Sequence, residues 1–99
     1  MIRGTTPTHE FTIPFDVSLI DDLRISYEQL GEVKLEKSKK DCVLEGNTIA
    51  FTLTQEETLL FLTHANVKLQ VRVKTTDGNV LTSEIIKLSV GQCINDEVL

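Results

Sequence analysis

Three glycine-containing turns, at Gly31, Gly46 and Gly78, divide most of the chain into short stretches of alternating apolar and polar residues. Alternation with a period of two is typical of a strand with one buried face, and glycine between such stretches marks a hairpin turn. The pattern predicts a small all-β domain. Six or seven strands at roughly ten-residue spacing, with one short helical turn, are typical of a two-sheet β-sandwich of immunoglobulin-like or similar Greek-key layout.

The length and composition fit one globular domain, residues 1–99, because 40% of the residues are hydrophobic. The formal net charge of -5 weighs against nucleic acid as a partner, since phosphate binding needs a positive surface. No apolar run approaches the roughly 20 residues that span a bilayer, so no membrane partner is expected. Residues 1–7 lack the apolar core of a secretion signal, and we expect a cytoplasmic protein or one released by lysis.

The strands are predicted from their alternation. The first covers residues 8–14 and places Phe11 and Ile13 on its buried face, and the clearest covers residues 67–74. The others are predicted at residues 23–28, 33–36, 42–44, 48–53 and 81–90. Residues 15–22 break the alternation, which predicts a loop or one helical turn at the end of the sandwich.

The register of the hairpin around Gly31 can be chosen by comparing two loop lengths. A two-residue loop ending at Gly31 places Ile25 opposite Glu36, an apolar residue against a charged one. A three-residue loop, residues 29–31, places Ile25 opposite Leu35 and gives Gly31 the left-handed position. We therefore predict the three-residue loop.

The last strand contains a change of parity. A two-residue turn at Asp77-Gly78 pairs Leu69 with Ile86, which fits, but the pairs nearer the turn set apolar residues against polar ones. The buried parity changes between Ser83 and Ile86, and this change predicts a β-bulge there.

One short helical turn is predicted between the strands. Thr54 and Glu57 have the spacing of a capping box, which predicts a turn over residues 55–60. The apolar run at residues 59–62 is expected to pack in the core under this crossover, and an exposed patch for a partner is the alternative.

The longest cluster of basic residues contains four lysines. Its lysines are interleaved with acidic residues, so a solvated edge strand or turn is expected. The cluster consists of Lys34, Lys37, Lys39 and Lys40.

No motif for metal binding is present. His9 and His64 are far apart in the sequence and lie in no metal-binding spacing. We therefore expect His9 to be a strand-edge residue and His64 to lie in a loop. Asp16, Asp21 and Asp22 lack the spacing of a calcium loop and are expected to be turn aspartates and helix caps. We predict no metal and no cofactor.

No catalytic constellation is present either. None of the five serines lies in a G-x-S-x-G elbow, and tryptophan, the usual platform for sugars, is absent. A domain of this size leaves little room for a deep cleft between carboxylates, so we expect no enzyme and no catalytic residue. Cys42 and Cys93 lie far apart in the sequence, and either two free thiols or a disulfide is compatible with it; a reducing cytoplasm favours thiols.

Several stretches resemble a known family. They are IRGTTPTH at residues 2–9, FTIPFD at 11–16, LTQEET at 53–58, and SVG with DEVL at 89–91 and 96–99. They are similar to small proteins encoded by phages and prophages of gut Clostridia and related Firmicutes, which are mostly uncharacterised. The resemblance spans nearly the whole chain and implies a setting among phage structural genes, with no catalytic residue to transfer.

Within that setting we expect a non-enzymatic structural protein, associated with the tail or baseplate, that acts through edge-strand or loop contacts. Its partners would be other phage structural proteins or copies of itself, and it would reside in the cytoplasm of the bacterial host during assembly or in the virion. The amino-terminal arm, residues 1–7, and the polar tail, residues 92–99, are expected to become ordered on assembly. A carbohydrate- or host-surface-binding module with exposed aromatics is the alternative, and a prophage regulator with a basic face is a third candidate.

Overall fold

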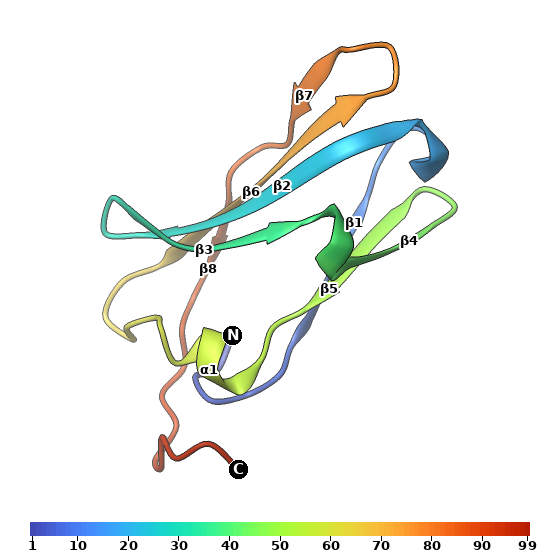
Figure 1. Cartoon of the computed structure of the whole chain (residues 1–99). Helices are drawn as coiled ribbons and strands as arrows, with labels where there is room; N and C mark the ends of the chain where they lie inside the picture. The colour runs from blue at the N-terminus through green and yellow to red at the C-terminus, as the bar shows by residue number, and fades with distance from the viewer.

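The structure is a computed structural model that describes every residue of the chain, 1–99. It contains eight strands in two antiparallel sheets that pack face to face (Figure 1). The smaller sheet has the order β1-β5-β4, with β1 at Thr8–Thr12, β5 at Thr48–Thr52 and β4 at Cys42–Glu45. The larger sheet contains β3 (Glu32–Ser38), β2 (Ile20–Gln29) and β6 (Val67–Thr75), and then β7 (Val80–Thr82) and β8 (Ile86–Leu88), which both pair with β6. The predicted two-sheet β-sandwich is confirmed.

Three short helical segments join the strands. They are the 3-10 turns η1 (Val17–Leu19) and η2 (Lys39–Asp41) and the helix α1 (Gln55–Thr58). The predicted capping box is present at α1: the hydroxyl of Thr54 accepts from the N–H of Glu57 at 3.2 Å, and the Glu57 carboxylate accepts from the N–H of Thr54 at 2.8 Å. The helix ends earlier than predicted, at Thr58.

The core lies between the sheets and contains 13 buried hydrophobic residues. The alternate apolar residues of β6 all point into it, as the sequence predicts. Three aromatic rings form its centre: the ring centroid of Tyr27 lies 6.3 Å from that of Phe51 and 5.8 Å from that of Phe61. Phe61 is fully buried, whereas its neighbours Leu60 and Leu62 are exposed, so only part of the apolar run at residues 59–62 serves the core.

The hairpin between β2 and β3 differs from the predicted one. Its loop has two residues, Leu30 and Gly31, with φ of 54° and 79°, as in the type I′ turn that suits twisted hairpins. A β-bulge at Lys34 of β3 then shifts the pairing by one residue, so that Ile25 lies opposite Lys37. The predicted three-residue loop is wrong. It was chosen to avoid pairing an apolar residue with a charged one, but Ile25 does pair with Lys37, whose charge is matched by Glu57 inside the fold.

The hairpin between β6 and β7 also has a different loop. The N–H of Thr75 donates to the carbonyl of Asn79 at 2.8 Å, so residues 76–78 form the turn, with Gly78 in the left-handed region at φ 88°. The loop is therefore one residue longer than the predicted Asp77-Gly78 turn.

The predicted bulge in the last strand is confirmed. Thr82 pairs with Arg72, and Ile86 pairs with Leu69 as predicted, so one extra residue lies between the two ladders. The bulge divides the last predicted strand into β7 and β8, and the chain therefore forms eight strands rather than six or seven.

The two terminal segments already contact the domain. In residues 1–7, Ile2 forms a parallel β-bridge with the chain that follows β8. The guanidinium of Arg3 reaches Asp96, in residues 92–99, at 2.7 Å. Both segments thus make contacts within a single chain.

Candidate functional site

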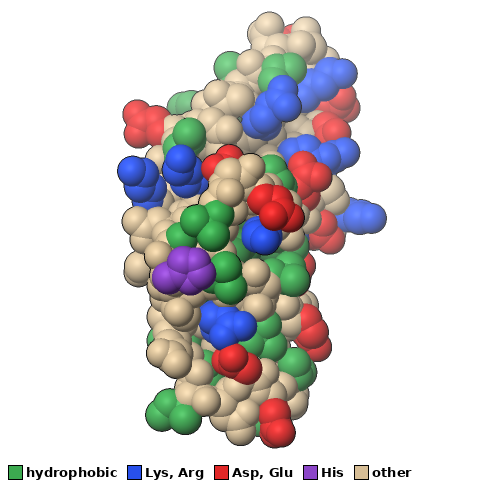
Figure 2. All heavy atoms as spheres, turned by 90° about the vertical axis from the view of Figure 1, so that its left-hand side faces the viewer, with side chains coloured by type: hydrophobic (Ala, Val, Ile, Leu, Met, Phe, Trp, Pro, Cys, Tyr) green, Lys and Arg blue, Asp and Glu red, His purple; other side chains and the backbone are tan.

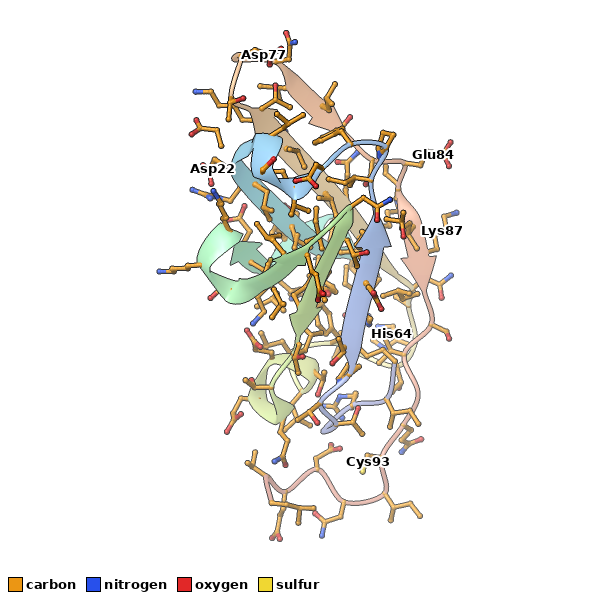
Figure 3. The ribbon with its side chains drawn as sticks, turned by 90° about the vertical axis from the view of Figure 1, so that its right-hand side faces the viewer. Asp22, His64, Asp77, Glu84, Lys87 and Cys93 are labelled. Atoms are coloured by element: carbon orange, nitrogen blue, oxygen red, sulfur yellow. The ribbon has the colours of Figure 1, made fainter.

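One side of the sandwich lacks a covering strand. The larger sheet has four positions across, β3, β2, β6 and then β7 in line with β8, whereas the smaller sheet has three. The outer strand β1 lies over β2 and β6, because His9 contacts Tyr27 of β2 and Phe11 lines a pocket with Val71 of β6. No strand of the smaller sheet continues beyond β1 to cover β7 and β8 (Figure 3). We call this side, which consists of β1, residues 13–15, β7, residues 83–85 and β8, the open flank.

β1 presents a free backbone edge on the open flank. Its only partner is β5, and just beyond that ladder the N–H of Ile13 donates to the carbonyl of Asn47 at 2.8 Å. Hydrogen-bonded pairs alternate along antiparallel strands, so the odd-numbered residues of β1 bond to β5. The N–H and C=O groups that point away from β5 are those of Thr8, Glu10 and Thr12.

An apolar pocket of about 360 Å³ lies beside this edge. Its apolar lining comes from Phe11, Ile13 and Phe15 on one side and from Val71, Val73 and Leu81 on the other. The first three belong to β1 and the segment after it, and the last three belong to the larger sheet. The pocket therefore opens between the two sheets.

The larger sheet exposes apolar side chains along the open flank. Leu81 of β7 is paired with Val73, so it lies on the inner face of the sheet, yet 47% of it is exposed. Ile86 of β8 is paired with the buried Leu69 and is 38% exposed. Inner-face side chains of a sandwich are normally covered by the opposing sheet. Their exposure here follows from the missing strand.

The edge formed by β7 and β8 is interrupted. Each of these strands has only three residues, and Ser83 in the bulge between them bonds back to β6. The N–H of Ser83 donates to the carbonyl of Val71 at 2.8 Å, and the hydroxyl of Ser83 accepts from the N–H of Val71 at 2.9 Å. Short strands and bulges protect a sheet edge from further pairing. β1 is therefore the continuous free edge of the open flank.

His9 fixes β1 to the larger sheet. Its Nδ1 lies 2.6 Å from the hydroxyl oxygen of Tyr27, and its ring packs on Phe51 with centroids 5.8 Å apart. Burial lowers the pKa of His9 and raises the pKa of Tyr27. Both groups are therefore neutral at pH 7, and one donates a hydrogen bond to the other. His9 lies in an edge strand, as predicted, but its side chain points toward the core.

On the opposite side of the sandwich, an ion pair joins β3 to α1. Lys37 of β3 points inward, is only 8% exposed, and places its Nζ 2.7 Å from the carboxylate of Glu57 in α1. Burial opposes ionisation of Glu57, but the hydrogen bonds from Lys37 and from Thr54 outweigh it and hold the pKa of Glu57 below its ordinary value. The prediction that Lys37 is solvated is wrong, because α1 brings a counter-ion to it.

The remaining acidic residues and His64 form no shared site. Asp16 caps η1 by accepting from the N–H of Ser18 at 2.8 Å, and this bond lowers the pKa of Asp16, so the predicted helix cap is confirmed. His64 lies in the loop before β6, as predicted. Asp21 and Asp22 are exposed on β2, so the prediction that they lie in a turn or cap a helix is wrong, because β2 begins at Ile20. No group of three potential metal ligands is present.

The two cysteines are not bonded to each other. Cys42 is half-buried on β4, and Cys93 is half-buried after β8. Burial raises the pKa of the Cys42 thiol to about 11. Since the thiolate is the nucleophilic form, Cys42 is a poor nucleophile at neutral pH.

Charges of both signs are interspersed on the outer surface. On the face that Figure 2 shows, no block of one sign stands out. The outer face of β6 carries Lys68, Arg72 and Lys74, but β2 places Glu28 opposite Lys68 and Asp22 opposite Lys74. This pattern does not favour the third candidate, a regulator with a basic face.

The aromatic side chains offer no exposed platform. Tyr27, Phe51 and Phe61 are buried, and Phe11 and Phe15 are half-buried. The end loops carry none of them in an exposed position, so the geometry does not favour the carbohydrate-binding alternative.

The fold thus defines an all-β sandwich whose open flank carries one continuous free edge, that of β1. No protein-family model, no curated protein and no solved structure matches the chain. None of its helices has the length and apolar character needed to traverse a bilayer.

Sequence reasoning did not find the open flank. The one available signal is the apolar pair Ile85-Ile86 beside Leu81, which exceeds what a half-buried edge strand requires. The alternation predicts which side chains of a strand point inward but not whether another strand covers them.

Proposed function

We propose that this chain is a non-enzymatic structural protein of a phage or prophage, associated with the tail or baseplate, and that it acts through edge-strand contacts with other structural proteins. The proposal combines the resemblance of residues 2–9, 11–16 and 53–58 to phage proteins with the geometry of the open flank. A cytoplasmic location during assembly, followed by incorporation into the virion, is part of the proposal.

The single observation that carries it is the free edge of β1 beside uncovered apolar side chains. Native monomers usually protect sheet edges with charges, bulges or covering loops. Here the bulge at Ser83 interrupts the edge of β7 and β8, whereas β1 has no bulge and carries one charge, that of Glu10. A continuous free edge beside an apolar pocket supports a role in assembly.

The test is proteomic analysis of particles from a lysogen that carries the gene. Particles are purified after induction, and the chain is quantified by mass spectrometry against the major tail proteins. We expect a fixed copy number relative to those proteins, as a symmetric assembly requires. A deletion strain should lose complete particles and regain them when the wild-type gene is supplied.

Two observations made together would contradict the proposal. Particles that lack the chain, together with normal yield and infectivity of the deletion strain, would exclude a structural role.

A further inference from the structure

We infer that the open flank is an acceptor site for one extended strand from another protein, which adds to the edge of β1 and completes the smaller sheet. This inference rests on the proposed function, because it names the chemical form of the partner. The occupant is a polypeptide segment in β conformation, with apolar residues at alternate positions.

The backbone of β1 determines the conformation of the occupant. Thr8, Glu10 and Thr12 direct three N–H and three C=O groups away from β5, and an extended strand presents donors and acceptors at the same spacing. β1 has five residues, which correspond to about 17 Å of paired strand at about 3.4 Å per residue. Addition of a strand to a free sheet edge is an established mode of peptide recognition.

The uncovered side chains determine the inner face of the occupant. A strand beside β1 lies in the fourth position of the smaller sheet and therefore faces β7 and β8 of the larger one. Its inward side chains would cover Leu81 and Ile86 and enter the pocket lined by Phe11, Val71 and Val73. Apolar side chains at every second position satisfy this surface.

Charge on β1 argues against a second copy of the chain as the occupant. A symmetric antiparallel pair of β1 strands over their full length would place Glu10 opposite Glu10 of the other copy, and like charges directly opposite each other are destabilising. The net charge of -5 adds to this repulsion, and residues 92–99 carry Asp96 and Glu97. The complementary occupant is a heterologous strand with a basic residue opposite Glu10.

A nine-residue probe tests the inference directly. The acetylated and amidated peptide Thr-Val-Thr-Val-Lys-Val-Thr-Val-Thr has an apolar face, a polar face and a central lysine. It is titrated into the full-length protein labelled with ¹⁵N, and amide shifts and hydrogen exchange are recorded. We expect new protection of the amides of Thr8, Glu10 and Thr12, whereas those of His9 and Phe11 are protected already by β5.

Two exposed residues of β7 provide a matched pair of variants. Leu81 and Val80 are 47% and 54% exposed, but only Leu81 is on the inner face. Leu81→Ser should weaken peptide binding about tenfold or more, whereas Val80→Ser should leave it within about twofold. Glu10→Pro removes the outward N–H without breaking the β1–β5 ladder, and it should abolish binding. If Glu10→Pro does not fold, the difference in peptide binding between Leu81→Ser and Val80→Ser still tests the inference.

Charge preference is tested with a second peptide in which glutamate replaces the central lysine. The wild type should prefer the lysine peptide, and Glu10→Lys should reverse this preference. Equal binding of both peptides by both proteins would overturn the assigned charge of the partner.

Two further results would overturn the inference. One is peptide-induced shifts that cluster away from the open flank, or none at all. The other is a dimer in light scattering that protects Thr8, Glu10 and Thr12 without peptide, since the occupant would then be a second copy. Neither result bears on the presence of the chain in purified particles, so failure of this inference and failure of the proposed function are distinguishable.

Discussion

Gln29 is the buried amide that holds the crossover between α1 and β6 against the larger sheet. Its side chain is 1% exposed and makes three hydrogen bonds to the backbone of that crossover. Nε2 donates to the carbonyls of Leu62 at 2.6 Å and Ala65 at 2.9 Å, and Oε1 accepts from the N–H of Leu62 at 2.8 Å. We predict that Gln29→Met, which preserves the volume but removes all three bonds, strongly destabilises the fold.

The magnitude follows from the number of groups left without a partner. A buried backbone group that loses its hydrogen bond costs about 1–3 kcal/mol. Leu62 is itself exposed, so water can reach part of this segment, and we take about 1 kcal/mol for each of the three bonds. The expected loss is about 3 kcal/mol, which corresponds to a fall in Tm of about 12–24 °C for a domain of this size.

The assay is urea denaturation followed by far-UV circular dichroism, because the chain has no tryptophan. The matched control is Gln70→Met, since Gln70 is half-buried and makes one bond, from Nε2 to the carbonyl of Ser83 at 3.1 Å. That variant should lose less than about 1 kcal/mol. A loss below about 1 kcal/mol for Gln29→Met, or equal losses for both variants, would refute the reasoning.

Three further predictions concern pH, the buried ion pair and the tail. Burial lowers the pKa of His9, so the folded state favours the neutral imidazole. The stability that neutral His9 contributes is complete above about pH 6.5 and is lost as the pH falls through the lowered pKa. The free energy of unfolding should therefore decrease between about pH 7.5 and about pH 5. His9→Gln should flatten this part of the profile, and an unchanged profile would contradict the assignment. A double-mutant cycle of Lys37→Met and Glu57→Gln should give a coupling energy of about 1–2 kcal/mol, and a value near zero would show that burial cancels the attraction. Deletion of residues 92–99 should leave a folded monomer in size-exclusion chromatography with light scattering, because the tail lies outside the open flank; a wild-type oligomer that dissociates on deletion would instead place self-assembly in the tail.

Local patterns accounted for most of the secondary structure. Alternation identified the strands, since the inward residues of β6 are apolar whatever lies next to it. The capping box at Thr54 and the cap at Asp16 also depend only on nearby backbone groups. The bulge after Ser83 was predictable because a change of parity leaves a direct trace in the sequence.

Registers and buried polar groups were not predictable in the same way. The sequence argument treated Lys37 as solvated and Gln29 as a turn residue, because their partners Glu57 and Leu62 are distant in the chain. Pairing Ile25 with Lys37 is favourable only once α1 lies over the end of β3. These positions were decided by contacts between segments that no local pattern relates.

The sequence by itself determined that the chain forms short strands with one apolar face, joined by glycine turns into a sandwich, because side-chain period and backbone φ are local properties. Only the tertiary structure decided that the smaller sheet ends at β1 and leaves Leu81 and Ile86 uncovered. Strand order depends on which edges meet in space, and an edge strand and a central strand can carry the same alternation. The candidate site therefore exists because the smaller sheet is one strand narrower than the larger sheet.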